Sequence, residues 1–136
     1  MGQEVEYIFK YAKAFTKGLQ DVSNGKINGA LGTSKHFFSD GATQYGANEG
    51  SATVINFDKF VDHNIQGYKG SIEEEVGSVM VSYSAINFVP NSYNSYFLQG
   101  VLRDDLGFRG FTISDYDEVE RTETMQLPRT MMNVST

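Results

Sequence analysis

Three apolar segments, each preceded by an amphipathic stretch, constrain the fold of this chain more than any other feature of its sequence. The apolar segments have the length and composition of strands, and the stretches before them carry apolar residues at three- and four-residue spacing, as in helices. In chain order these six segments are 3–20, 30–38, 56–75, 78–86, 93–106 and 110–114. Strands separated by helices favour right-handed β/α crossovers, so we expect an α/β fold with a parallel sheet.

Composition narrows the possible functions. The chain has 136 residues and no cysteine, which predicts one domain without disulfides or a thiolate metal site. Its net charge of -6 argues against nucleic acid or an anionic membrane as a partner. No apolar run approaches the roughly 20 residues of a membrane span. The charged, amphipathic residues after Met1 differ from a secretory leader, so we expect none here, and the compartment stays open.

Polar side chains fall near the ends of all three expected strands. Lys35 and His36 end the first, Tyr83 lies near the end of the second, and Asp115 follows the third. In β/α folds the carboxyl ends of parallel strands carry the chemistry, so these residues are expected to converge. Taken singly, each has an ordinary explanation as a solvated lysine, a packed tyrosine or a helix-capping aspartate.

The stretch FTISDYDEV concentrates carboxylates after an apolar strand. Residues 111–113 are expected to be buried, and Asp115, Asp117 and Glu118 follow them directly. The carboxylates form either a solvated loop or a catalytic site in which Asp115, kept ionised by Lys35, acts as a nucleophile. Two further alternatives remain open from the residues alone: a Schiff base on Lys35, or a cation bound by the three carboxylates.

Three blocks of sequence, in order, resemble the N-terminal catalytic domain of glycoside hydrolase family 3, which comprises β-glucosidases and exo-β-glucanases. The blocks are KHFFSDGATQYGANEG, SVMVSYSAIN and LRDDLGFRGFTISDYDEV. The similarity runs from about Tyr11 to Glu120. It implies a (β/α)₈ TIM-type barrel and retaining cleavage of terminal β-D-glucosyl residues, for which no cofactor or metal is needed.

The resemblance also implies roles for individual residues. Asp115 corresponds to the family nucleophile, and Lys35 and His36 to the pair that contacts sugar hydroxyls. Tyr83 corresponds to a tyrosine close to the nucleophile. Tyr116 stands where the family usually has tryptophan, and either ring can stack on a sugar. The substrate implied is a β-glucoside or a β-glucan oligosaccharide.

The length of the chain limits what it is expected to do alone. A complete barrel takes about 250 residues, so this chain supplies roughly three β/α units of a partial barrel. We expect residues 1–136 to be a fragment of the barrel domain, with the missing half, a second domain and the acid/base carboxylate in a longer parent. Family members are often secreted. The alternative is a non-catalytic remnant or a weak sugar-binding domain.

Overall fold

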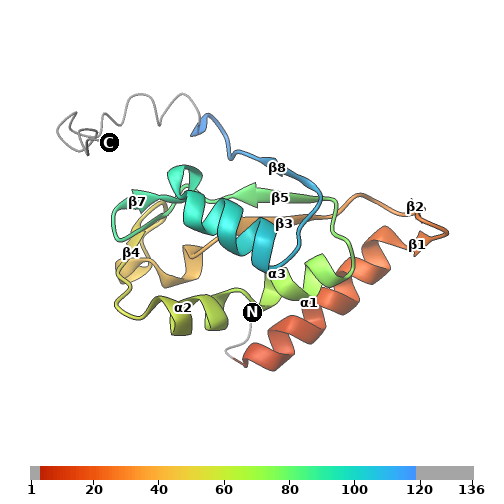
Figure 1. Cartoon of the computed structure of the whole chain (residues 1–136), viewed down its shortest axis with the longest axis horizontal. Helices are drawn as coiled ribbons and strands as arrows, with labels where there is room; N and C mark the ends of the chain where they lie inside the picture. Colours follow the sequence, from red (N-terminus) through yellow and green to blue (C-terminus); the bar gives the residue numbers. More distant parts are fainter. Residues whose placement is uncertain (1–3, 119–136) are drawn as a thin grey trace.

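A three-stranded parallel sheet forms the centre of the fold in the computed structural model, which describes residues 4–118 (Figure 1). Its strands are β3 (Thr33–Phe37), β5 (Ser78–Val81) and β8 (Phe111–Ile113), in the spatial order β3-β5-β8. Val79 is the register partner of Ser34 on one side and of Thr112 on the other. All three strands predicted from the sequence are therefore present, and they are parallel.

Helices connect the strands as the periodicity predicted. They are α1 (Val5–Gln20), α2 (Phe57–Asn64), α3 (Gln66–Glu73) and the π-helix η4 (Tyr96–Asp105). Helices α1 and α3 pack against each other on one side of the sheet (Figure 1). Gly70 allows this close approach, because a Cβ at that position would lie 2.4 Å from the Phe9 carbonyl oxygen. Gly70 is unfavourable for a helix interior, but the packing of α1 against α3 requires it.

The single helix expected over 56–75 is divided at Ile65. The Asn64 side chain donates to the Phe60 carbonyl at 2.8 Å, and the Gln66 side chain donates to the Asp62 carbonyl at 2.9 Å. Such side-chain hydrogen bonds compete with the helix ladder. Ile65, at the junction of α2 and α3, is itself buried in the hydrophobic core.

Short strands also form between the six expected elements. Strands β1 (Val22–Ser23) and β2 (Lys26–Ile27) make a hairpin, for which Asn24 and Gly25 supply the positive φ angles of the turn. A second three-stranded sheet has the order β4-β6-β7. The bounds of its strands and of the three 3₁₀ helices are β4 Ser51–Ala52, β6 Ala85–Ile86, β7 Val89–Pro90, η1 Asp40–Ala42, η2 Gln44–Gly46 and η3 Asn91–Tyr93.

This second sheet corrects an expectation from the sequence. The strand predicted over 78–86 is interrupted after Val81 and resumes as β6 in the other sheet. Residues 87–92, between the strand expected over 78–86 and the helix expected over 93–106, contain β7, which pairs antiparallel with β6. Strands of two residues such as β6 and β7 are too short to produce a recognisable alternation of apolar and polar residues, so the periodicity of the sequence did not predict them.

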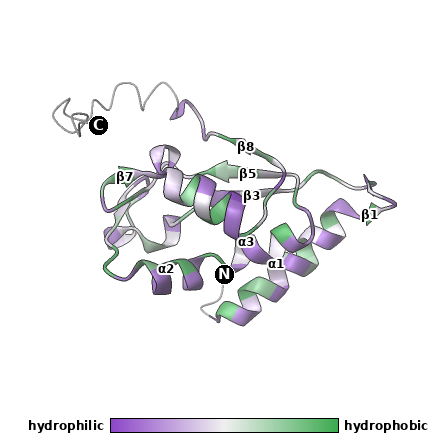
Figure 2. Cartoon of the chain, in the orientation of Figure 1, coloured by the Kyte–Doolittle hydropathy of each residue, from purple (hydrophilic) through white to green (hydrophobic). Residues whose placement is uncertain are grey.

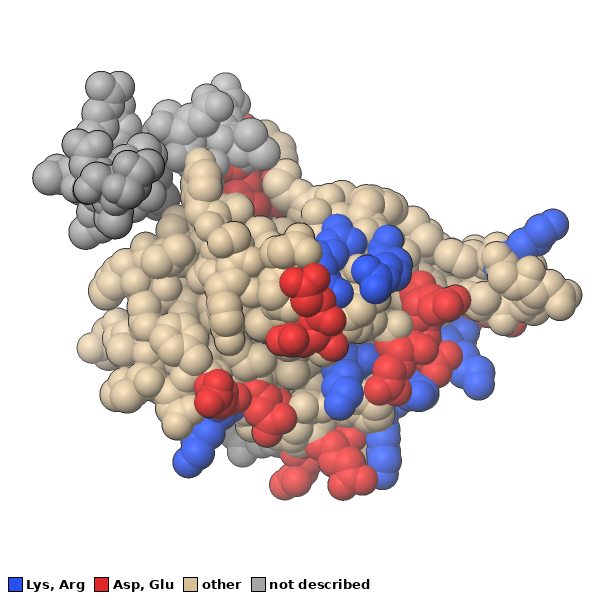
Figure 3. Space-filling view, in the orientation of Figure 1, with Lys and Arg blue, Asp and Glu red and all other residues tan. Residues whose placement is uncertain are grey.

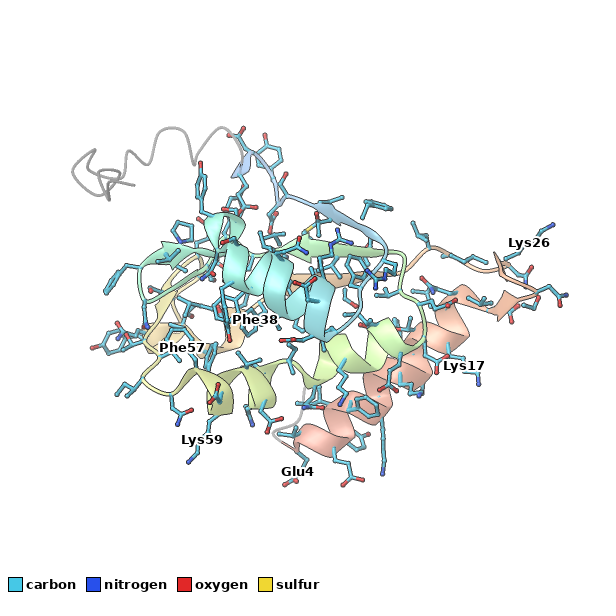
Figure 4. All side chains as sticks on the ribbon, viewed as in Figure 1. Glu4, Lys17, Lys26, Phe38, Phe57 and Lys59 are labelled. Atoms are coloured by element: carbon cyan, nitrogen blue, oxygen red, sulfur yellow. The ribbon has the colours of Figure 1, made fainter. Side chains whose placement is uncertain are left out.

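Aromatic side chains at the end of β3 join the sheet to its helices. Phe38 is fully buried, and its ring centroid lies 5.6 Å from that of Phe60 on α2 and 4.8 Å from that of Phe97 on η4. Figure 4 shows Phe38 in the interior, between the sheet and these helices. Hydrophilic residues occupy the outer side of α2 (Figure 2), as expected for a helix with one buried face.

Strand β8 was expected to be buried, and this prediction is wrong. Phe111 is 53% exposed and Thr112 is also exposed, because β8 has a strand on only one side among the described residues. Strand β3 forms the opposite edge.

Acidic and basic side chains intermingle on the surface of α1 and α3 (Figure 3). Within residues 4–118, no helix has the length and apolar character needed to cross a membrane.

Candidate active site

The carboxyl ends of the three parallel strands surround one open pocket of about 440 Å³. His36 reaches it from β3, Tyr83 from two residues beyond β5, and Asp115 from two residues beyond β8. Tyr116 lies beside Asp115 at the rim and is 82% exposed. Four of the five residues predicted for the site therefore line the same pocket.

The Asp115 carboxylate contacts both the backbone and a histidine. Its Oδ1 accepts a 2.6 Å hydrogen bond from the Tyr116 backbone N–H, and its Oδ2 lies 3.4 Å from His36 Nε2. The side chain is 24% exposed, so it is partly shielded from solvent and still open to the pocket. The backbone hydrogen bond and the neighbouring imidazole orient this carboxylate before a ligand arrives.

The side chain of Glu118 contacts the backbone of Asp115. It was expected to be a loop residue, but it is 3% exposed, and its Oε2 accepts a 3.2 Å hydrogen bond from the Asp115 N–H. Burial raises the pKa of the Glu118 carboxyl group above its ordinary value, and the hydrogen bond from Asp115 opposes this shift. Asp117, by contrast, is exposed. The three carboxylates of this stretch therefore differ in environment: Asp115 faces the pocket, Asp117 is exposed and Glu118 is buried.

The cation alternative gains no support from this geometry. In the described part of the chain, no group of three or more His, Asp or Glu side chains is arranged to hold a metal ion. Glu118 is buried behind the backbone of Asp115, while Asp117 faces solvent.

Lys35 does not line this pocket. It is exposed and borders a separate groove between β3 and the helices, together with Tyr11 and Phe15 of α1. No ion pair joins it to Asp115 within residues 4–118, and His36 takes that place. The role in sugar binding stays a prediction for Lys35. An exposed amine also lacks the desolvation that activates a Schiff-base lysine.

Asp40 is part of the site and was missed by the sequence reasoning. Its Oδ2 lies 2.8 Å from His36 Nδ1, and its Oδ1 accepts hydrogen bonds from the Ser82 and Ser84 hydroxyls. The one available signal was its spacing four residues after His36 in KHFFSD. The serines carried no signal, because only the folded chain places the segment after β5 beside this loop.

Tyr68 fixes the backbone on the other side of His36. Its hydroxyl donates to the His36 carbonyl oxygen at 2.5 Å. Burial, and to a lesser extent the charge of Asp40, raise the pKa of the Tyr68 hydroxyl, so it remains a donor at any physiological pH. The histidine is therefore held at its main chain, and its two ring nitrogens face the carboxylates of Asp40 and Asp115.

The fold and this pocket define a class: an α/β protein with an acidic site at the carboxyl ends of parallel strands. The sequence profile described as "Glycosyl hydrolase family 3 N terminal domain" matches residues 1–135. The chain belongs to this family, and the family resemblance drawn from the sequence blocks is confirmed.

Known proteins similar to the chain are glycosidases. A beta-xylosidase from Formosa agariphila is 32% identical over 127 residues, which cover 91% of this chain and 17% of that protein. A periplasmic beta-glucosidase from Salmonella typhimurium is 28% identical over 108 residues, covering 79% of this chain and 14% of that protein. A beta-hexosaminidase from Vibrio cholerae is 30% identical over 131 residues, with coverage of 93% and 37%.

Solved structures give the same result. An exo-1,3/1,4-beta-glucanase from a Pseudoalteromonas species superimposes with a TM-score of 0.75 and 29% identity, over 85% of this chain and 15% of that one. A beta-glucosidase from Erythrobacter marinus gives 0.72 and 30%, over 84% and 15%. The predicted fold class, an α/β partial barrel with parallel strands, is confirmed. The chain spans less than two fifths of each of these relatives.

Proposed function

We propose that this chain carries the nucleophile side of a retaining β-glucosidase site. Asp115 attacks the anomeric carbon of a terminal β-D-glucosyl residue, the bond from that carbon to the leaving oxygen breaks, and the covalent glycosyl-enzyme that results is later hydrolysed by water. The observation that carries the proposal is the position of Asp115: its carboxylate faces an open pocket at the carboxyl ends of parallel strands, next to the imidazole of His36.

The other pocket residues have roles compatible with this chemistry. His36 and Tyr83 lie where hydroxyl groups of a bound sugar can contact them, and hydrogen bonds of this kind stabilise the transition state when they strengthen as charge develops. Tyr116 presents an exposed ring at the rim, suitable for stacking on a sugar face. For Lys35 we still predict a contact with the sugar, in the longer protein.

The acid/base group is assigned to a part of the longer protein beyond this chain, together with the rest of the barrel and a second domain. A retaining enzyme requires a second group, which protonates the leaving oxygen. In such enzymes this group is a carboxyl group about 5–5.5 Å from the nucleophile. The chain alone is accordingly proposed to be inactive. The substrate class is a β-glucoside or a β-glucan oligosaccharide, and the beta-xylosidase and beta-hexosaminidase relatives make the identity of the sugar the first point to test.

Mass-spectrometric trapping tests the proposal. The purified chain and the longest product of its gene are each incubated with an activated 2-fluoro glucoside, with the 2-fluoro xyloside in parallel, and the labelled peptide is mapped. A label on Asp115 in the longer product, absent from Asp115→Asn, supports the proposal. A label on a different carboxylate contradicts it. No label on any product favours the non-catalytic remnant.

A further inference from the structure

The imidazole of His36 lies between two carboxylates from different parts of the chain. Its Nδ1 is 2.8 Å from Asp40 Oδ2, and its Nε2 is 3.4 Å from Asp115 Oδ2. An ionised carboxylate can only accept hydrogen bonds, and a neutral imidazole has one donor and one acceptor nitrogen. The shorter contact, to Asp40, therefore assigns the ring proton to Nδ1 and leaves Nε2 directed at Asp115 and the pocket.

Asp40 is itself held in place by buried groups. Its Oδ1 accepts from the hydroxyls of Ser82 and Ser84, which are 1% and 2% exposed. The Ser84 backbone N–H in turn donates to Ser82 Oγ at 2.9 Å. One oxygen of Asp40 is thus fixed by the segment after β5, while the other faces the histidine of β3.

We propose that Asp40 is a positioning residue that sets the ring orientation and the tautomer of His36 beside Asp115. The functional part of this inference rests on the proposed role of Asp115. With the proton on Nδ1, Nε2 can accept a hydrogen bond from a sugar hydroxyl, and as an imidazolium it donates to Asp115. Without Asp40 the ring loses the partner that distinguishes its two nitrogens, as occurs when the orienting carboxylate of a catalytic histidine is removed.

Nuclear magnetic resonance of the imidazole nitrogens tests the tautomer directly. The chain has two histidines, so a ¹⁵N-labelled sample gives two ring systems, and His63→Gln identifies the signals of His36. In the wild-type chain we expect neutral His36 to carry its proton on Nδ1. In Asp40→Ala we expect the Nε2–H form to gain population. Asp105→Ala, which removes an exposed carboxylate on η4, is the matched control and leaves the pattern unchanged.

Each outcome bears on the inference. Neutral wild-type His36 protonated on Nε2 overturns it without any variant, so the test does not depend on the folding of Asp40→Ala. A folded Asp40→Ala whose His36 nitrogens are unchanged also overturns it, and its amide spectrum reports folding. Ser84→Ala keeps the carboxylate and removes one of its anchors, so it is expected to give a smaller change in the same direction.

A kinetic measurement separates this inference from the proposed function. In the longest gene product, Asp40→Ala is expected to slow labelling of Asp115 by the 2-fluoro glucoside about 10- to 100-fold, as expected for a displaced catalytic contact. An unchanged labelling rate with an altered tautomer contradicts the functional role of Asp40 and leaves Asp115 as the nucleophile. A label elsewhere contradicts the proposed function, while the tautomer result still stands for the structure.

Discussion

One buried polar side chain, that of Gln20, links three segments of this small fold. Gln20, at the last position of α1, is fully buried. Its Oε1 accepts from the backbone N–H groups of Gly32 and Gly77 at 2.9 and 3.0 Å, and its Nε2 donates to the carbonyls of Glu74 and Glu75. One side chain therefore joins the end of α1 to the start of β3 and to the turn between α3 and β5.

Gln20→Ala is expected to reduce the free energy of unfolding by about 3 kcal/mol, because it leaves two buried N–H groups without an acceptor. Urea unfolding monitored by circular dichroism measures the change. Gln99→Ala removes an exposed glutamine with one side-chain partner and is the control, with an expected effect within about 0.5 kcal/mol. Equal effects of the two substitutions would contradict the structural role of Gln20.

Glu118 predicts a dependence of stability on pH. Burial raises its pKa in the folded chain above the ordinary value of 4.5, so the folded state binds this proton more tightly than the unfolded state does. The stabilising contribution is then fully present below the unfolded pKa and is lost as the pH rises through the folded pKa. Glu118→Gln avoids this loss, because its side chain stays neutral.

The gain in unfolding free energy of Glu118→Gln over wild type is therefore expected to increase from about pH 4 to about pH 7. Urea titrations across this range measure the trend. Asp117→Asn, at the exposed neighbouring carboxylate, serves as the control and is expected to show no such increase. A gain that falls with increasing pH would contradict the assignment of burial as the main cause of the shift.

At the scale of elements, the sheet has two open edges in the described part of the chain. Strands β3 and β8 each have one neighbour, and β8 exposes Phe111. An exposed apolar edge strand is a template for pairing with another chain. The open edges are therefore sites at which two copies of the chain can pair in solution.

We expect the purified chain to self-associate as its concentration rises, and Phe111→Lys to weaken this association at least about tenfold, equivalent to about 1.4 kcal/mol. Analytical ultracentrifugation gives the association constant. Ile55→Lys adds the same charge at a 96% exposed apolar residue outside the β3-β5-β8 sheet, so it is the matched control. Equal weakening by both substitutions would indicate a charge effect and not edge pairing.

At the scale of the whole molecule, the site is a pocket on one rim of a short sheet. The carboxylates around it come from loops after β3 and β8, and it is open to solvent. The glycosidases to which the chain is similar are more than twice its length. In the function proposed above, this pocket supplies the groups that contact the sugar from one side.

The 136-residue chain is accordingly expected to show no sustained hydrolysis of 4-nitrophenyl β-D-glucoside above the buffer rate. Nitrophenolate can leave without being protonated, but a retaining enzyme still requires a second group that activates water to hydrolyse the glycosyl-enzyme. Release of nitrophenol is followed over hours, with Asp115→Asn as the blank. Activity that is present in the wild-type chain and lost in Asp115→Asn would overturn this expectation and show that the groups present already suffice.

The amino-acid sequence by itself determined the larger elements, the α/β class and the family. Long amphipathic periods and apolar strands are local patterns, so α1, α3, β3, β5 and β8 could all be predicted, and Asp115 was singled out by its position after a strand. The break at Ile65 and the short strands were missed, since side-chain competition with the helix ladder and two-residue pairings leave no periodic signal.

The tertiary structure alone decided which polar groups meet. Asp40 contacts Ser82 and Ser84, more than 40 residues away in the sequence. Gln20 and Glu118 are buried by the packing of the chain around them. His36, and not Lys35 as expected, lies beside Asp115. The side chains of β8 are likewise exposed because, in the described part of the chain, this strand has a neighbour on one side only. The sequence determines local conformation through side-chain pattern, whereas burial and pairing depend on the packing of the whole chain.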